Sequence, residues 1–593
     1  MFLKLKEIPF DKKDNQYIAI LSVIFSFFMV FGKSFYLTNS WDLVVGSISA
    51  IIRSVIMATA YFGIFFTVLH GLWAILVYPD KFYQAIPLMC KHSNKEKKVP
   101  ILLRYFDDHP FLISFIFLVM IYLPHVIAFY PGIFMGDTPD LIAQGFNLPE
   151  YTSTYLNLLD EAVRLNQHHP VAHTVLLHVF LVIGHSVFHS WNFGLFMYSL
   201  FQTLLLTCGF SICIAKLTAW GVNRKMRIAV LLYFAFSPRI QNYLMLVTKD
   251  PIYTVFLLFF LLSFFTLLKN DEKNEQISSR ENLKNNIVFL SSILGMILFR
   301  NDSKYILLLV FGSVFIAVKK YRKKCAIIIL AILIFTSLYA GILSAMKISP
   351  GSRREILSIP FQQTARYLRD VPDYEITDEE RAAIDAILDY ESIKQEYNPD
   401  RSDVVKATFN ESATTKELLE YFKAWFQMFL KHPGIYIQAT MNNVYDYFYP
   451  GGLVSYRYSE KQSMKIMETM NEYYSEADFD FHYNNKTHSL RSMIEMIEII
   501  FYLPIFSVFI IPATYTWSVF ILFAADMKQR KNAETIILLP ILFTILMCIA
   551  GPCNGWYFRY IFPIAGCLPF LIAVQFAGQN SSIAIHHITN RRF

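Results

Sequence analysis

The sequence predicts an all-α polytopic membrane protein with about 12 transmembrane helices, and its composition and long apolar runs carry this prediction. Of the 593 residues, 55% are hydrophobic, 16% are aromatic and 17% are charged. A soluble protein carries about 25% charged residues. Several apolar runs, such as 55–77 and 325–345, reach the ~18 residues that cross a bilayer's hydrocarbon core.

The basic residues support the same conclusion. The net charge is +7, and the basic clusters flank apolar runs at 95–98, 319–324, 528–531 and 591–592. Positive charge on the cytoplasmic side of membrane helices explains these clusters without nucleic acid as a partner. The charged N-terminus is too long for a cleaved signal peptide, so we expect a retained first helix. The seven cysteines lie mostly within or beside apolar runs and imply no disulfide framework.

The apolar runs and basic loops together predict a path through the membrane. We expect spans near 17–36, 54–78, 111–130, 194–217, 227–247, 252–268, 287–300, 304–318, 325–346, 503–526, 533–551 and 557–577. With both termini in the cytoplasm, the basic loops then lie inside. The predicted outer segments are 37–53, 131–193, 248–251, 300–303, 347–502 and 552–556.

One apolar stretch, 168–190, does not fit this path. A full crossing here would put the later basic loops on the wrong side of the membrane. The stretch also carries six histidines, which are costly on a lipid-exposed helix. We therefore expect an interfacial helix within the outer loop 131–193.

Four regions follow from this path. They are 1–110 with two N-terminal spans and a basic cytoplasmic loop, 111–346 as the transmembrane core, 347–502 as a mainly helical extracytoplasmic domain, and 503–593 with the closing spans and a basic cytoplasmic tail. The third region is long enough to bury its own core. Its aromatic segment 444–452 suits either acceptor binding or an interfacial aromatic belt.

Polar residues from separate loops gather at the predicted outer face. They are Asp137, Asp140, His168, His169, Lys249, Asp250, Arg300 and Arg559. Taken singly, Asp250 suits a helix cap, Arg300 an anchor at the headgroups, and the histidines an amphipathic interface. Asp137 is different, because no strong helix is expected directly after it to cap. Together, acids, histidines and arginines at one face indicate a site for an anionic lipid-linked substrate.

The order of these motifs resembles that of the C-type superfamily of membrane glycosyltransferases (GT-C). The matching pieces are GDTPD at 136–140, HHPVAHTVLLHVF at 168–180 and TKDPIYTVF at 248–256. The resemblance covers about residues 111–350. Within the superfamily, the chain most resembles poorly characterised bacterial multi-span proteins that share a pattern found here as SIPFQQTAR at 358–366. The absence of a WWD-type motif argues against an oligosaccharyltransferase proper.

The resemblance implies roles for individual residues. Both Asp137 and Asp250 would be catalytic. Asp137 would be the acceptor base or a metal ligand, and Asp250 would assist it or bind the metal. The expected ligands of the donor phosphate are Lys249, Arg300, Arg366 and Arg559, and further candidates for binding substrate or metal are Asp140, His168, His169, Gln362 and Gln363. The involvement of a divalent metal, Mg²⁺ or Mn²⁺, stays open. The two N-terminal spans precede the matched region.

The expected function is glycosyl transfer at the outer face of a bacterial cytoplasmic membrane. The sugar would pass from a polyprenyl-phosphate donor to a glycan, glycopolymer or protein acceptor, by an inverting displacement with a carboxylate base. The alternatives are a transporter or flippase of a polar lipid or sugar, a membrane O-acyltransferase that uses His173 or His178, and a non-catalytic envelope scaffold. Transporters tend to place ionisable residues in mid-membrane, whereas these spans are apolar in their middles.

Overall fold

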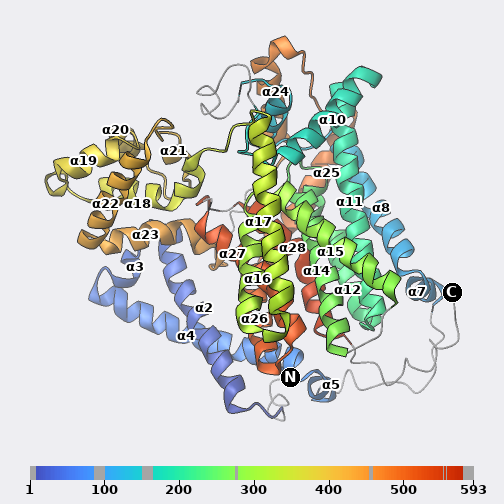
Figure 1. Ribbon diagram of the computed structural model, residues 1–593. Coiled ribbons are helices and arrows are strands. Elements are labelled where there is room, and N and C mark those ends of the chain that lie inside the picture. The colour runs from blue at the N-terminus through green and yellow to red at the C-terminus, as the bar shows by residue number, and fades with distance from the viewer. Residues whose placement is uncertain are drawn as a thin grey trace.

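Figure 1 shows the computed structural model of the chain. It describes residues 8–85, 100–149, 165–273, 278–452, 458–551, 553–555 and 557–577. The basic clusters predicted to face the cytoplasm at 95–98 and 591–592 lie outside the described residues.

Helices and short 3-10 turns build the fold, and the described residues contain no β-strand. Nine helices within them are long and apolar enough to cross a membrane, which makes the chain a multi-pass membrane protein. These helices are α2 (Lys12–Thr38), α4 (Ile48–Val77), α8 (Pro110–Ala128), α10 (Val171–Phe188), α11 (Trp191–Ala219), α14 (Asp250–Lys273), α15 (Ser279–Phe299), α17 (Arg322–Ala345) and α27 (Asn532–Ala550). Two shorter apolar helices are α16 (Ser303–Ala317) and α28 (Phe562–Val574).

The remaining helices connect or cover this bundle. Those before residue 347 or after 503 are α3 (Asp42–Val45), α5 (Pro79–Ala85), α7 (Ile101–Asp108), α9 (Thr138–Gly145), α12 (Arg224–Phe236), α13 (Pro238–Leu244) and α26 (Pro512–Gln529). Those between are α18 (Ser358–Asp370), α19 (Asp378–Asp385), α20 (Tyr390–Glu396), α21 (Asp403–Lys406), α22 (Thr415–Lys431), α23 (Pro433–Val444), α24 (Glu460–Tyr473) and α25 (His488–Glu498).

Helix α14 is the centre of the bundle. In its most apolar stretch 83% of the residues are buried, against 17% in α4 and 11% in 319–345. Small residues allow its neighbours to come close: a Cβ on Gly295 of α15 would lie 2.1 Å from the Phe256 ring. Helix α14 is therefore surrounded by protein, while α4 and α17 present their apolar side chains outward.

Three of the expected spans differ in their helical extent. The span expected near 227–247 is not a single helix, because α12 ends at Phe236 and α13 begins at Pro238. Proline lacks an N–H and disfavours helical geometry in the residue before it. In the predicted span 503–526 the α-helix begins only at Pro512, and in 557–577 it begins at Phe562.

The histidine-rich stretch forms α10, which packs along α11. Their closest approach joins two glycines, where a Cβ on Gly184 would lie 2.1 Å from the Cα of Gly194. The length and apolar composition of α10 also suit a membrane crossing. Its interfacial placement therefore stays a prediction.

The region 347–502 has two parts. Residues between Leu357 and Tyr436 share a hydrophobic core of their own, and we call the part of the chain built around it, residues 353–444, the outer domain. Residues from Val444 to Tyr483 instead join the core of the apolar helices. In Figure 1 the first part, α18 to α23, extends to one side of the bundle above α2, α3 and α4.

The aromatic segment 444–452 lies at the junction of these parts. Tyr445, Tyr447 and Phe448 are buried. The Phe448 ring stacks on Phe28 of α2, and its carbonyl accepts a hydrogen bond from Trp517 Nε1 at 2.8 Å. This segment is therefore packed as core, rather than exposed as an acceptor platform or an interfacial belt.

Candidate active site

Backbone hydrogen bonds bring the loop after α8 against the loop before α14. The Ile133 N–H donates to the Met245 carbonyl at 2.7 Å, and the Val247 N–H donates to the Ile133 carbonyl at 3.0 Å. The Thr138 hydroxyl donates to the Val247 carbonyl at 3.0 Å. Because the loops run side by side, Asp137 is held near the residues that follow Val247.

Buried polar side chains of α10 and α11 hold the loop before α14 in place. The Gln202 Nε2 of α11 donates to the carbonyls of Leu244 and Leu246, both at 2.9 Å. The Tyr198 hydroxyl lies 2.6 Å from His173 Nε2 and donates to the Thr248 carbonyl at 3.3 Å. His173, which the acyltransferase alternative would use, thus has a structural role in holding this loop.

The histidine loop before α10 is held by two further segments. The Gln167 N–H donates to the Ser349 carbonyl at 2.9 Å. Asn301, between α15 and α16, donates from Nδ2 to the carbonyls of Gln167 and His168 at 2.9 and 3.2 Å. The loops that carry His168, His169 and Arg300 therefore converge.

Asp137 forms an ion pair with Arg559. Its Oδ2 lies 2.8 Å from Arg559 Nη1, and the Asp137 side chain is 25% exposed while that of Arg559 is 10% exposed. Burial alone would raise the pKa of the Asp137 carboxyl, but the positive charge of Arg559, and then that of Lys249, holds this pKa well below its usual range. Asp137 is therefore an ionised carboxylate that remains partly accessible.

The expectation that no helix follows Asp137 directly is wrong. Helix α9 begins at Thr138, and Asp137 occupies its N-cap position. The side chain nevertheless makes no capping hydrogen bond and binds Arg559 instead. A structural role as helix cap therefore does not account for this carboxylate.

Lys249 and Asp250 lie side by side at the start of α14. The Lys249 Nζ lies 3.5 Å from His169 Nδ1. Burial, and then the charge of Arg559, lowers the pKa of the Lys249 ammonium. The Asp250 carboxylate is buried and accepts a hydrogen bond from Thr248 Oγ1 at 3.0 Å, at the positive end of the helix dipole.

The two histidines complete this side of the cluster. Their rings meet edge to face, with centroids 4.6 Å apart. Burial, followed by the charges of His168 and Lys249, holds the pKa of His169 well below its usual range. His169 Nε2 is buried and has no hydrogen-bond partner among the described residues. A neutral ring nitrogen is thus open to a ligand.

Arg300 reaches the same helix start from α15. Its guanidinium carbon lies 5.0 Å from the centroid of the Tyr253 ring, in the first turn of α14. Its Nε donates to Asp302 at 2.8 Å. Its Nη1 and the Nε of Arg559 are buried without a partner among the described residues. Such unpaired donors are expensive unless a ligand or water satisfies them.

The structure separates Arg366 from this cluster. Its guanidinium donates to Asp370, to the Asn39 carbonyl after α2 and to Gln438. The side chain is 2% exposed. These contacts tie the outer domain to the N-terminal helix pair, and they leave the guanidinium unsuited to the expected phosphate binding.

The remaining candidates are buried in helices. Gln362 Nε2 donates to the Asn398 carbonyl at 2.9 Å, and Gln363 bonds with Thr440 and Trp425. Both glutamines therefore serve the outer domain rather than the cluster around Asp137. Asp140 lies buried in the first turn of α9.

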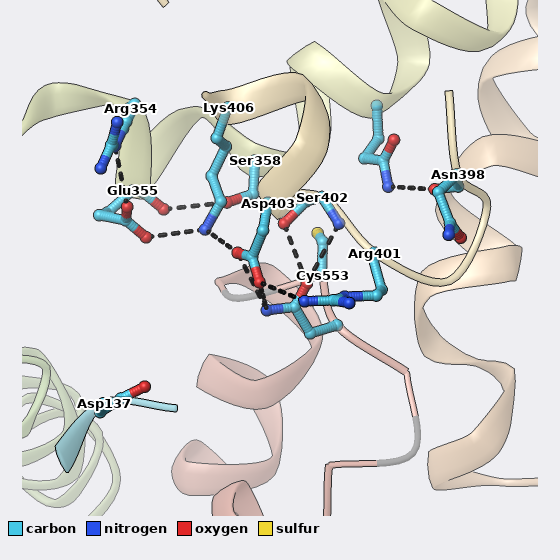
Figure 2. Close-up of polar contacts among 12 residues, drawn as sticks. Asp137, Arg354, Glu355, Ser358, Asn398, Arg401, Ser402, Asp403, Lys406 and Cys553 are labelled. Atoms are coloured by element: carbon cyan, nitrogen blue, oxygen red, sulfur yellow. Dashed lines mark hydrogen bonds and ion pairs between the residues drawn. The ribbon is translucent and has the colours of Figure 1, made fainter. Parts of the chain in front are cut away.

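A second charged group, which the sequence did not suggest, belongs to the outer domain. Figure 2 shows Lys406 between Glu355 and Asp403, with Asp137 on a neighbouring element. The Lys406 Nζ lies 2.8 Å from Glu355 and 2.9 Å from Asp403. Burial would raise the pKa of Glu355, but Lys406 and then His168 lower it to about 2. Asp403 lies three residues before Lys406, but Glu355 is distant in sequence, so no local motif marks the three residues as a group.

No group of three or more His, Cys, Asp or Glu side chains within the described ranges could hold a metal ion. Asp137 is paired with Arg559 and Asp250 with Thr248. Arg559 and Lys249 supply positive charge beside Asp137.

Fold and site together define a multi-pass helical membrane protein with a buried, incompletely paired polar cluster where separate loops meet. The model of a family described as "Family of unknown function (DUF6020)" matches residues 151–588, and the chain belongs to this family. The match includes Lys249, Arg300 and Arg559 but begins after Asp137. No curated protein and no solved structure matches the chain.

Proposed function

We propose that this protein is a GT-C-type membrane glycosyltransferase that uses a polyprenyl-phosphate sugar. The observation that carries the proposal is the convergence of an accessible carboxylate, Asp137, with the buried Arg559 and the half-buried Lys249. Arginine suits phosphate because its planar fork binds two oxygens, and lysine adds a point charge. Nearby donors on Arg300 and Arg559 have no partner among the described residues.

The cluster suggests a direct displacement. The donor phosphate would bind Arg559 and Lys249, with its polyprenyl tail among the apolar helices. The acceptor hydroxyl would attack the anomeric carbon and give its proton to Asp137. The bond between the anomeric carbon and the phosphate oxygen breaks, its electron pair leaves with the polyprenyl phosphate, and the anomeric configuration inverts.

The Asp137–Arg559 ion pair has a consequence for this step. In the free protein the pair lowers the basicity of Asp137. A phosphate that competes for Arg559 would weaken the pair and raise the pKa of Asp137. Substrate binding would then prepare the base, and the site would lie at the outer face of the cytoplasmic membrane.

One observation favours a second candidate, a flippase of a polar lipid. The segment that leads to Lys249 and Asp250 is interrupted between α12 and α13. Broken helices beside buried charges are typical of transporters. A flippase would move a labelled lipid across a vesicle bilayer without forming a glycosidic bond.

Transfer from a radiolabelled polyprenyl-phosphate sugar by the purified, full-length protein tests the proposal. With a cell-envelope extract as acceptor, Asp137→Asn should lower the transfer rate by about 10²- to 10⁴-fold, the usual contribution of a general base. The control is Asp373→Asn, because that carboxylate is 64% exposed in the outer domain. Equal transfer by Asp137→Asn and the wild type would overturn the role of Asp137. Lipid transbilayer movement without transfer would favour the flippase.

A further inference from the structure

The outer domain holds the segment that leads to Arg559. Residues 398–406 run beside residues 553–555, where Arg401 and Asn554 form an antiparallel bridge. The Ser402 N–H donates to the Cys553 carbonyl at 3.1 Å, and the Gly555 N–H donates to the Asp400 carbonyl at 2.8 Å. This junction, which we call the 400/554 joint, lies only a few residues before Arg559.

The backbone at the joint adopts a conformation that it would not take unaided. Cys553 has φ of 49°, in the left-handed region. This region costs a residue with a side chain roughly 1–2 kcal/mol, and it persists where surrounding contacts over-determine it. The joint supplies such contacts, because Asn443 Nδ2 of α23 also approaches the Cys553 carbonyl at 3.4 Å. The position of the 553–555 segment is thus imposed by the outer domain.

Lys406 is the buried charge behind this joint. Its side chain is 6% exposed and pairs with both Glu355 and Asp403. Asp403 in turn accepts from Asn554 Nδ2 at 3.1 and 3.2 Å. Asn554 Oδ1 closes the joint by accepting from the Ser402 N–H at 3.1 Å. A chain of charged and polar contacts therefore runs from Lys406 to the segment that carries Arg559 (Figure 2).

We propose that Lys406 is a positioning residue, which sets the place of Arg559 through Asp403 and Asn554 and so makes the outer domain a part of the phosphate-binding site. The proposal rests on the proposed role of Arg559 as a phosphate ligand. Lys406 itself does not touch the substrate. Lys406 is buried, whereas Asp403 is 44% exposed, so Lys406 acts as a fixed anchor for this carboxylate and its loss would release Asp403 from its place.

The matched variants are Lys406→Met and Lys431→Met. Both remove an ammonium that pairs with a carboxylate in the outer domain, but Lys431 pairs with Glu380 at 2.6 Å, outside the joint. In the full-length protein, hydrogen exchange of the peptide 553–561 should become at least about 10-fold faster in Lys406→Met and stay unchanged in Lys431→Met. Unchanged exchange in Lys406→Met would overturn the positioning role.

A double-mutant cycle with Arg559→Gln provides the second readout. The probe is a fluorescent polyprenyl phosphate in mixed micelles. Lys406→Met should weaken binding about 10-fold in the wild-type background and hardly at all in the Arg559→Gln background, because residues that act through one another are not additive. Equal losses in both backgrounds would contradict positioning through Arg559. Unchanged binding by Arg559→Gln would instead contradict the proposed phosphate site itself.

Asn554→Ala serves if Lys406→Met does not fold. This variant removes the hydrogen bonds between Asn554 and Asp403, while Lys406 keeps both of its carboxylate partners. It should show the same faster exchange at 553–561 and the same non-additivity with Arg559→Gln. Wild-type exchange and full additivity in Asn554→Ala would overturn the proposal.

Discussion

Two charged clusters at opposite ends of the bundle both pair a carboxylate with a cation, but they differ in how completely their polar atoms are bonded. At the end where α2 begins, Asp14 accepts from Trp73, Tyr78, Lys528 and the Asp11 N–H. At the other end, Asp137 pairs with Arg559, while His169 Nε2, Arg300 Nη1 and Arg559 Nε have no partner among the described residues.

The difference separates a structural cluster from a binding site. The contacts of Asp14 join α2, α4 and α26, and its carboxylate has no exposed surface. Its hydrogen-bonding capacity is used within the protein. The Asp137 cluster instead has buried donors without a partner among the described residues, and its carboxylate is one quarter exposed. Since buried polar groups are normally paired, the unpaired donors point to a ligand.

The largest contrast is expected for the two cations. Arg559→Gln should weaken binding of a polyprenyl phosphate about 10- to 100-fold, because it removes a charged hydrogen bond worth ~1.5–3 kcal/mol. Lys528→Gln at the Asp14 cluster should leave binding unchanged. Titration of both purified variants with the labelled lipid measures the contrast. Equal affinity losses would show that the two clusters do not differ in this way.

The reverse contrast is expected in stability. Asp14→Ala should lower the free energy of unfolding by about 3 kcal/mol, because it leaves the Trp73 and Tyr78 donors and part of the Lys528 charge uncompensated. Its affinity for the lipid should not change. Thermal unfolding in detergent, compared with Asp137→Ala, measures the effect. A larger loss of stability in Asp137→Ala would make the Asp137 cluster the structural one.

The smallest effect concerns pH. Because the pKa of His169 is depressed in the fold, the unfolded chain binds a proton below its ordinary value of about 6.5 that the folded chain does not. Stability is therefore full above that pH and falls as the pH drops below it, by about 1 kcal/mol at pH 5.5.

His169→Asn should remove this part of the pH dependence, as measured by unfolding midpoints between pH 7.5 and 5.5. His189→Asn is the control, because His189 is exposed at the end of α10. A wild-type slope in His169→Asn would contradict the assignment of a buried neutral ring to His169.

Much of the candidate site could be predicted because apolar runs and basic loops predict the path of the chain through the membrane. The predicted path places five polar residues at one face, and the structure brings them together. They are Asp137, His169, Lys249, Arg300 and Arg559. Their pairing could not be predicted, because it depends on backbone bonds between distant loops such as Ile133 with Met245 and Val247.

The failures have physical causes as well. The motif 358–366 looked functional, but α18 uses Gln362, Gln363 and Arg366 to build the outer domain and attach it to α2. The interruption of the span expected over 227–247 follows from Pro238, whose effect the hydrophobic pattern masked. Lys406 carried no local signal, because its partner Glu355 is distant in sequence.

The most direct test of the central claim is a structure of the full-length protein in a lipid nanodisc with a bound polyprenyl phosphate. We expect phosphate oxygens within hydrogen-bond distance of Arg559 and Lys249, and an Asp137 carboxylate that has separated from Arg559. A phosphate bound elsewhere, with the 2.8 Å Asp137–Arg559 pair intact, would contradict it.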